Sequence, residues 1–110
     1  MESLIALDAL LARQVMGWTE AGRGWRTASG DRVAYFRPTI RRGDALRLSA
    51  RLRDLGFSLS LPARRASDEE GEYRVVFGRG DESWSVLAES EPLAISLAAR
   101  LALAQLTVSA

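Results

Sequence analysis

Along the first part of this 110-residue chain, apolar residues recur at the spacing of an amphipathic helix. The positions that repeat every three or four residues are Leu4, Leu7, Leu11 and Val15. Ser3 is a candidate N-cap before them, and Gly17 is a natural helix stop after them. The pattern therefore predicts a first helix from about Leu4 to Met16.

A glycine-rich segment and a second amphipathic helix follow. Residues 17–31, GWTEAGRGWRTASGD, predict a loop or an irregular hairpin, and residues 32–36, RVAYF, form a short β-like run. Pro38 and Thr39 then introduce the second helix, which ends at Gly56. Its apolar stripe comprises Ala45, Leu48, Leu52 and Leu55.

Three short strands are predicted in the second half of the chain. Phe57 to Leu61 (FSLSL) alternates strictly, and Tyr73 to Phe77 (YRVVF) and Ser83 to Ala88 (SWSVLA) have the composition of strands. The charged residues 62–71 predict a loop between the first two strands. The four residues from Gly78 to Asp81 are expected to connect the last two as a hairpin.

The last predicted element is a helix from about Leu93 to Leu106, with Ser90 as its candidate N-cap. It is apolar nearly all round, and such a helix is usually central to a core or covered by a partner subunit. We therefore expect a homo-oligomer. Arg100 and Gln105 interrupt the apolar run, which is shorter than the roughly 20 residues that a membrane span requires, so no membrane partner is expected.

Together these elements predict one α+β domain spanning residues 1–110. Their order is helix, irregular β segment, helix, three strands and helix. The short links between strands favour antiparallel pairing, so we expect a small antiparallel sheet of about three to four strands packed with three helices. The N-terminus, MESLIALDAL, lacks the basic region of a secretory signal, and we expect a cytoplasmic protein.

Composition narrows the possible chemistry. The chain contains no cysteine and no histidine, and all fifteen basic residues are arginine. This excludes thiolate catalysis and zinc–thiolate sites and removes the commonest general base. The carboxylates of SDEEGE (67–72) and RGDES (79–83) lie in polar, turn-like contexts, which we interpret as solvated loop charge. We expect no enzyme, no cofactor and no bound metal.

Four stretches occur in an order that characterises a known family. A helix runs into VMGW (15–18) and a segment that contains Trp25, and a leucine-rich helix ends at LRDLGF (52–57). The strands YRVVF and SWSVLAES then precede EPLAISLAARLALA (91–104). From Leu4 to Ala104 the chain thereby resembles the phage ABA sandwich domain family of small phage and prophage proteins. The resemblance implies a sheet packed with helices and a phage or prophage origin, and it implies no catalytic residues.

Charge is unevenly distributed along the chain. Residues 23–53 carry nine arginines and two aspartates, a net charge of +7, whereas residues 66–91 carry two arginines and eight carboxylates, a net charge of −6. One interpretation is that the two regions neutralise each other through weak surface pairs. The alternative is an anion site at Arg41 and Arg42, where the second helix is expected to begin, because helix N-termini attract phosphate or carboxylate.

Two tryptophans stand near arginines in the glycine-rich segment. Aromatic faces beside arginines can sandwich a nucleobase and hold its phosphate. The alternative is that both tryptophans are buried as a lid over the sheet, since large aromatic side chains are mostly buried in proteins. The predicted ligand-binding residues are Trp25, Arg23, Arg26, Arg41, Arg42 and Trp18. Of the two tryptophans, Trp18 is the better candidate for a lid and Trp25 for a ligand contact, and Trp84 is expected in the core.

These features predict a non-enzymatic phage or prophage accessory protein. Its most specific form is an anti-defence protein that sequesters a phosphate-bearing nucleotide-type immune signal in the host cytoplasm. One alternative is a protein–protein interaction module that inhibits a host protein. Another is weak nucleic-acid binding, which is less favoured because the chain has no lysine and no recognised reading motif.

Overall fold

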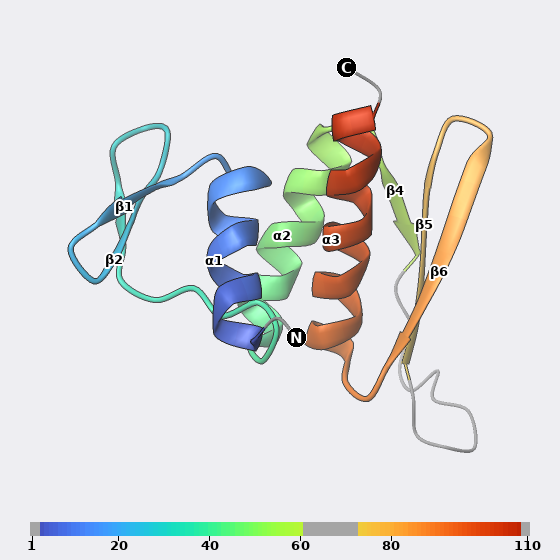
Figure 1. Ribbon diagram of the computed structural model, residues 1–110, viewed down its shortest axis with the longest axis horizontal. Helices are drawn as coiled ribbons and strands as arrows, with labels where there is room; N and C mark the ends of the chain where they lie inside the picture. Colours follow the sequence, from blue (N-terminus) through green and yellow to red (C-terminus); the bar gives the residue numbers. More distant parts are fainter. Residues whose placement is uncertain (1–2, 61–72, 109–110) are drawn as a thin grey trace.

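The computed structural model describes residues 3–60 and 73–108, with the side chains of residues 3–60 and 73–105. Three helices lie side by side between two sheets, which occupy opposite ends of the 42 Å long axis (Figure 1). The elements are α1 (Leu4–Gln14), β1 (Thr19–Ala21), β2 (Gly24–Arg26), β3 (Arg32–Val33), α2 (Arg42–Asp54), β4 (Ser58–Ser60), β5 (Tyr73–Arg79), β6 (Glu82–Ala88) and α3 (Glu91–Val108). In this part of the chain, no helix combines the length and hydropathy needed to cross a membrane.

Both sheets are three-stranded and antiparallel, in the orders β1-β2-β3 and β4-β5-β6. The fold is therefore α+β, as predicted, with a second sheet that the sequence indicated only as an irregular hairpin and a β-like run. Strands of two or three residues are too short to show the alternation by which a strand is recognised.

The two tight hairpins share one turn geometry. A glycine with positive φ, Gly22 at 62° and Gly80 at 63°, takes the first of two turn positions, as in a type II′ turn. The predicted connection from Gly78 to Asp81 is therefore too long. Strand β5 continues to Arg79, which pairs with Glu82, because the type II′ turn needs only two residues between paired strands.

The predicted helix caps are largely confirmed. The Ser3 hydroxyl accepts a hydrogen bond from the backbone N–H of Ala6 at 3.0 Å, and the Ser90 hydroxyl accepts one from Leu93 at 3.3 Å. Helix α1 ends at Gln14, two residues before the predicted Met16, and α3 begins at Glu91, two residues before the predicted Leu93. Helix ends of this kind are set by local hydrogen bonds rather than by the apolar period.

Two predicted strands are shorter in the structure. Only Arg32 and Val33 of the β-like run 32–36 pair with β2, since the chain then turns toward α1 and α2. Ser58–Ser60 of the run FSLSL pair with β5. Leu61 and the predicted loop 62–71 lie outside the described residues.

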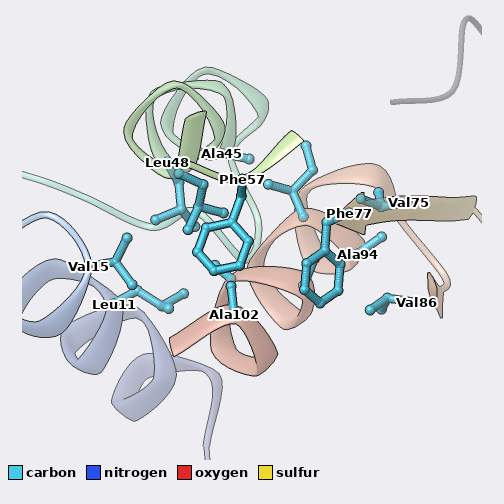
Figure 2. Packing of buried hydrophobic residues seen from close by; sticks show 14 of the residues in the cluster. Leu11, Val15, Ala45, Leu48, Phe57, Val75, Phe77, Val86, Ala94 and Ala102 are labelled. Atoms are coloured by element: carbon cyan, nitrogen blue, oxygen red, sulfur yellow. The ribbon is translucent and has the colours of Figure 1, made fainter. Parts of the chain in front are cut away.

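The main core lies where α3 packs against α1, α2 and the β4-β5-β6 sheet. Figure 2 shows side chains from all these elements converging there, with Phe57 and Phe77 in the middle. The buried face of α3 is made largely of small residues: Ala94, Ile95, Ser96, Ala98, Ala99 and Ala102. Trp84 was predicted in the core; it is half-buried and packs against the core by stacking on Phe77, with 5.3 Å between ring centroids. Because α3 is central to the chain, its apolar character has an explanation within one subunit, and the homo-oligomer stays a prediction.

Candidate functional site

A pocket of about 190 Å³ opens at the small-sheet end of the molecule. Its walls come from three parts of the chain that are far apart in sequence. Helix α1 contributes Ile5, Asp8 and Ala9, the β1–β2 hairpin contributes Arg23 and Trp25, and residues 34–37 complete the wall. We call this the α1–hairpin pocket. It is smaller than the roughly 300–1,000 Å³ of sites for drug-sized ligands, so it accommodates a group about the size of one ring.

The hairpin presents Arg23 and Trp25 because of its turn and its pairing. Arg23 occupies the second turn position, and Trp25 lies opposite Glu20 on one side and Val33 on the other. Gly24 allows β3 to approach closely, since a Cβ atom there would lie 2.4 Å from the Val33 carbonyl oxygen. The half-buried Trp25 ring can therefore pack beside the pocket while remaining partly accessible.

A buried carboxylate forms one wall of the pocket. Asp8 is only 3% exposed, and its Oδ1 accepts the backbone N–H of Thr39 at 3.0 Å. Its Oδ2 accepts the Thr39 hydroxyl at 3.0 Å and the Nε–H of Arg37, with which it forms an ion pair. The backbone N–H of Arg37 also donates to Asp44 Oδ2 at 2.9 Å. The Asp8–Arg37–Thr39 network thus fastens the segment after β3 to α1 and α2.

Arg37 is held firmly in its charged form. The hydrogen bond that Arg37 donates to Asp8 raises the pKa of Arg37 above the usual value for arginine; burial opposes that rise, and the charge of Asp8 and the Tyr35 side chain add to it. The bond to Asp8 uses Nε, which leaves the two Nη amino groups as donors for other partners. The Arg37 side chain is 22% exposed, and Arg37 lines the pocket.

This combination of groups is suited to a planar anion. Trp25 and Tyr35 supply aromatic surface, and Arg23 and Arg37 supply planar cations that bind phosphate or carboxylate through paired hydrogen bonds. Among the described residues, no group of three or more histidine, cysteine, aspartate or glutamate side chains could hold a metal ion.

Trp18 lies outside this pocket, in a small second core. It is 6% exposed and packs edge-on against Phe36, with ring centroids 4.8 Å apart, beside the buried Ala12. The guanidinium of Arg47 covers its ring at 5.0 Å. This is the position expected of a lid residue, as the packing interpretation of Trp18 predicted.

The other three predicted site residues lie apart from one another. Arg26 alternates with Trp25 along β2 and so faces the opposite side of the strand, where its Nη1 donates to the Gly30 carbonyl at 3.4 Å. Arg41 is the N-cap residue of α2, and its guanidinium lies 4.9 Å from the centroid of the Tyr35 ring. Arg42 points toward α3 and donates to Glu91 Oε1 at 2.8 Å. Of the six predicted residues, the pocket brings together Arg23 and Trp25.

The residues that the sequence did not single out for a site are Asp8, Tyr35, Arg37 and Thr39. For Asp8 the sequence does contain a signal. It directly follows Leu7 and precedes Leu11 by three positions, so it lies on the apolar stripe of α1. A carboxylate on a buried helix face requires charged or hydrogen-bonding partners. The identity of those partners, 29 and 31 positions later, emerges only from the folded chain.

The basic region keeps much of its charge in the described part of the chain. There, one ion pair joins residues 23–53 to the acidic region 66–91, namely Arg42–Glu91. Other arginines contact neutral groups: Arg51 Nε donates to the Val15 carbonyl at 3.0 Å and Arg53 Nη2 to that of Leu59 at 3.4 Å. The pocket itself is lined by two arginines, Arg23 and Arg37, and one carboxylate, Asp8.

Comparison with known proteins identifies the fold. Neither a family model nor a curated protein matches the sequence. The structure is similar to the 2.0 Å crystal structure of a phage protein from Bacillus cereus, with a TM-score of 0.73. The match covers 96% of this chain and 90% of that chain at 17% sequence identity. At this identity, the similarity shows that the two chains share a fold.

Proposed function

We propose that this protein is a non-enzymatic phage or prophage accessory protein that binds and sequesters a phosphate-bearing nucleotide, with the α1–hairpin pocket as its binding site. The observation that carries the proposal is the meeting of Arg23 and Trp25 in one pocket with Tyr35 and Arg37. An aromatic face beside arginine guanidiniums is a common arrangement for holding a base and its phosphate.

One observation supports the phage context, the similarity of the fold to that of a phage protein from Bacillus cereus. The resemblance of the sequence to the phage ABA sandwich domain family stays a prediction, since no family model matches the chain. A binding role is favoured over catalysis because the chain lacks histidine, cysteine and lysine, the side chains that most often act as bases and nucleophiles near neutral pH. In this proposal, the protein acts in the host cytoplasm by withdrawing a nucleotide-type immune signal.

A thermal-shift screen tests the proposal. The probes are cyclic dinucleotides, cyclic trinucleotides and ADP-ribose derivatives. A ligand at about 100 times its Kd adds roughly 2.7 kcal/mol of stability, which raises Tm by several degrees in a domain of this size. Trp25→Ala should abolish the shift, and Arg26→Gln, on the opposite side of β2, should preserve it. If no probe raises Tm at millimolar concentration, the proposal is wrong.

The exposed arginines favour one alternative, weak binding of nucleic acid. Exposed arginines such as Arg26 and Arg47, which contact a carbonyl oxygen and a ring, remain able to attract phosphates. Such binding would weaken steeply with salt, with a slope of log K on log salt close to the number of phosphates contacted. Titration of a labelled oligonucleotide at two salt concentrations, beside the nucleotide screen, distinguishes the two functions.

A further inference from the structure

We propose that the α1–hairpin pocket receives the base of the nucleotide, stacked on Trp25, and that Arg37, together with Arg23, binds the phosphate. The inference rests on the proposed function and specifies which part of the ligand each side chain contacts. It replaces the predicted anion site at Arg41 and Arg42 with a half-buried arginine, Arg37, that the sequence did not single out.

The size and the walls of the pocket favour a base. At about 190 Å³ the pocket has room for one ring system and too little for a whole nucleotide. Trp25 is half-buried, and the rim includes two strongly exposed apolar side chains, Tyr35 at 50% and Ile5 at 66%. A flat apolar ring that entered here would cover surface that is now exposed to water.

Arg37 is the cation best prepared to receive a phosphate. Its backbone N–H is fixed by Asp44 and its Nε by Asp8, so the side chain loses little conformational freedom when a ligand binds. Arg37 lines the pocket, and a guanidinium carries the planar donor pair that phosphate oxygens accept.

The arginines at the start of α2 are less suitable. Arg42 is engaged by Glu91 across to α3, and Arg41 Nε lies 4.0 Å from Asp44 Oδ2. Arg41 is 57% exposed and lies over the outer aromatic residue of the pocket, Tyr35. A phosphate bound to either guanidinium would lie outside the part of the pocket that Trp25 lines.

A purely structural role for Arg37 is the competing explanation, and a matched pair of ligands separates the two. The probes are AMP and adenosine, titrated by isothermal calorimetry into the wild-type protein and variants. Wild type should bind AMP more tightly than adenosine. Arg37→Gln should weaken AMP by about 10- to 100-fold, the effect of one charge-assisted contact, and leave adenosine unchanged. A structural role would instead weaken both probes equally and thereby overturn the inference.

Further variants keep the test decisive. Trp25→Ala should weaken both probes, because both contain the base, and Arg26→Gln should weaken neither. If Arg37→Gln does not fold, Arg37→Lys retains the cation beside Asp8 and removes the planar donor pair, so AMP alone should weaken. If AMP does not bind at all while a larger nucleotide from the screen does, the proposed function stands and this inference is wrong.

The three tryptophans provide a direct spatial readout. Each indole N–H gives one signal in a nitrogen–proton NMR spectrum, and Trp25→Phe assigns the signal of interest. AMP should shift the Trp25 signal and leave that of Trp84, which packs in the other sheet, in place. A shift of the Trp84 signal with an unchanged Trp25 signal would move the site away from this pocket.

Discussion

The two ends of this molecule are built by different means. At one end, the β4-β5-β6 sheet packs on α3 over a cluster of sixteen buried residues. At the other end, the β1-β2-β3 sheet is secured by a cluster of three buried residues, Ala12, Trp18 and Phe36. There the Asp8–Arg37–Thr39 network supplements the apolar contacts. The first end is stabilised by burial, whereas the second combines a small apolar cluster with directed polar contacts.

This difference separates stability from binding. The large cluster has the composition of an ordinary close-packed core. The end that carries the β1-β2-β3 sheet, which we call the small end, has strands of two or three residues. It also has a partly accessible tryptophan and a pocket that its own side chains do not fill. A buried ion pair adds little net stability compared with apolar packing, but its directionality holds the pocket wall in one arrangement.

The largest expected effect comes from truncating an aromatic residue in each cluster. Phe77→Ala should lower the free energy of unfolding by about 3–5 kcal/mol, measured by urea denaturation. Trp18→Ala should lower it by less, because the small end can open locally while the rest stays folded. Hydrogen exchange should then speed up in β1–β3 and remain slow in β5. Equal losses for the two variants would show that both ends form one cooperative unit.

The polar network at the small end should give the next largest effect. Asp8→Ala should destabilise the protein by about 2–3 kcal/mol, somewhat below the value for a fully buried pair, because the Arg37 side chain is 22% exposed and can reach water. Thr39→Val removes only the hydroxyl contact and should cost about 1 kcal/mol. If Asp8→Ala costs no more than Thr39→Val, the ion pair contributes nothing beyond its hydrogen bonds.

Close backbone approach is a further property of the small end. Gly24→Ala should destabilise the protein by roughly 1–3 kcal/mol, because the new Cβ would meet the Val33 carbonyl oxygen and push β3 from β2. Gly43→Ala, in the first turn of α2 with open space around it, should be neutral or stabilise by up to about 1 kcal/mol. Thermal unfolding of both variants provides the comparison, and similar Tm values would contradict it.

The smallest effect on stability is expected at a buried polar group in the core end, by which we mean the end that carries the β4-β5-β6 sheet. Ser96 is fully buried in α3, and its hydroxyl finds no hydrogen-bond partner among the described residues. Ser96→Ala should therefore be neutral or stabilise the protein by about 1 kcal/mol. The matched variant is Ser49→Ala, which removes a hydroxyl that donates to the Leu46 carbonyl at 2.9 Å. A clear loss of stability for Ser96→Ala would reveal a hidden partner for its hydroxyl.

The core end was largely predictable from the sequence. Apolar residues at helical spacing and strict alternation along strands reflect one buried face for each element, and caps such as Ser3 act within a few residues. The small end was predicted less well for the opposite reason. Its strands are too short to show a period, and Arg37 and Thr39 acquire their roles only by meeting Asp8 across about thirty residues.

The candidate site was likewise predictable only in part. The proximity of Arg23 and Trp25 follows from two positions on one hairpin, and the sequence predicted both. Arg41 and Arg42 are adjacent in sequence and were predicted to act together, yet their side chains engage Tyr35 in the segment after β3 and Glu91 in α3. Neighbouring residues on a helix point about 100° apart, so adjacency alone does not place two side chains in one site.

The buried pair of Asp8 and Arg37 also has a consequence for how relatives with this fold can diverge. Loss of either charge alone leaves the other without its buried partner, which is strongly destabilising, whereas replacement of both by apolar residues is often tolerated. The two positions should therefore change together between lineages. Relatives that keep the acid at position 8 should keep the arginine at position 37, and relatives that lose both should have lost the site with it.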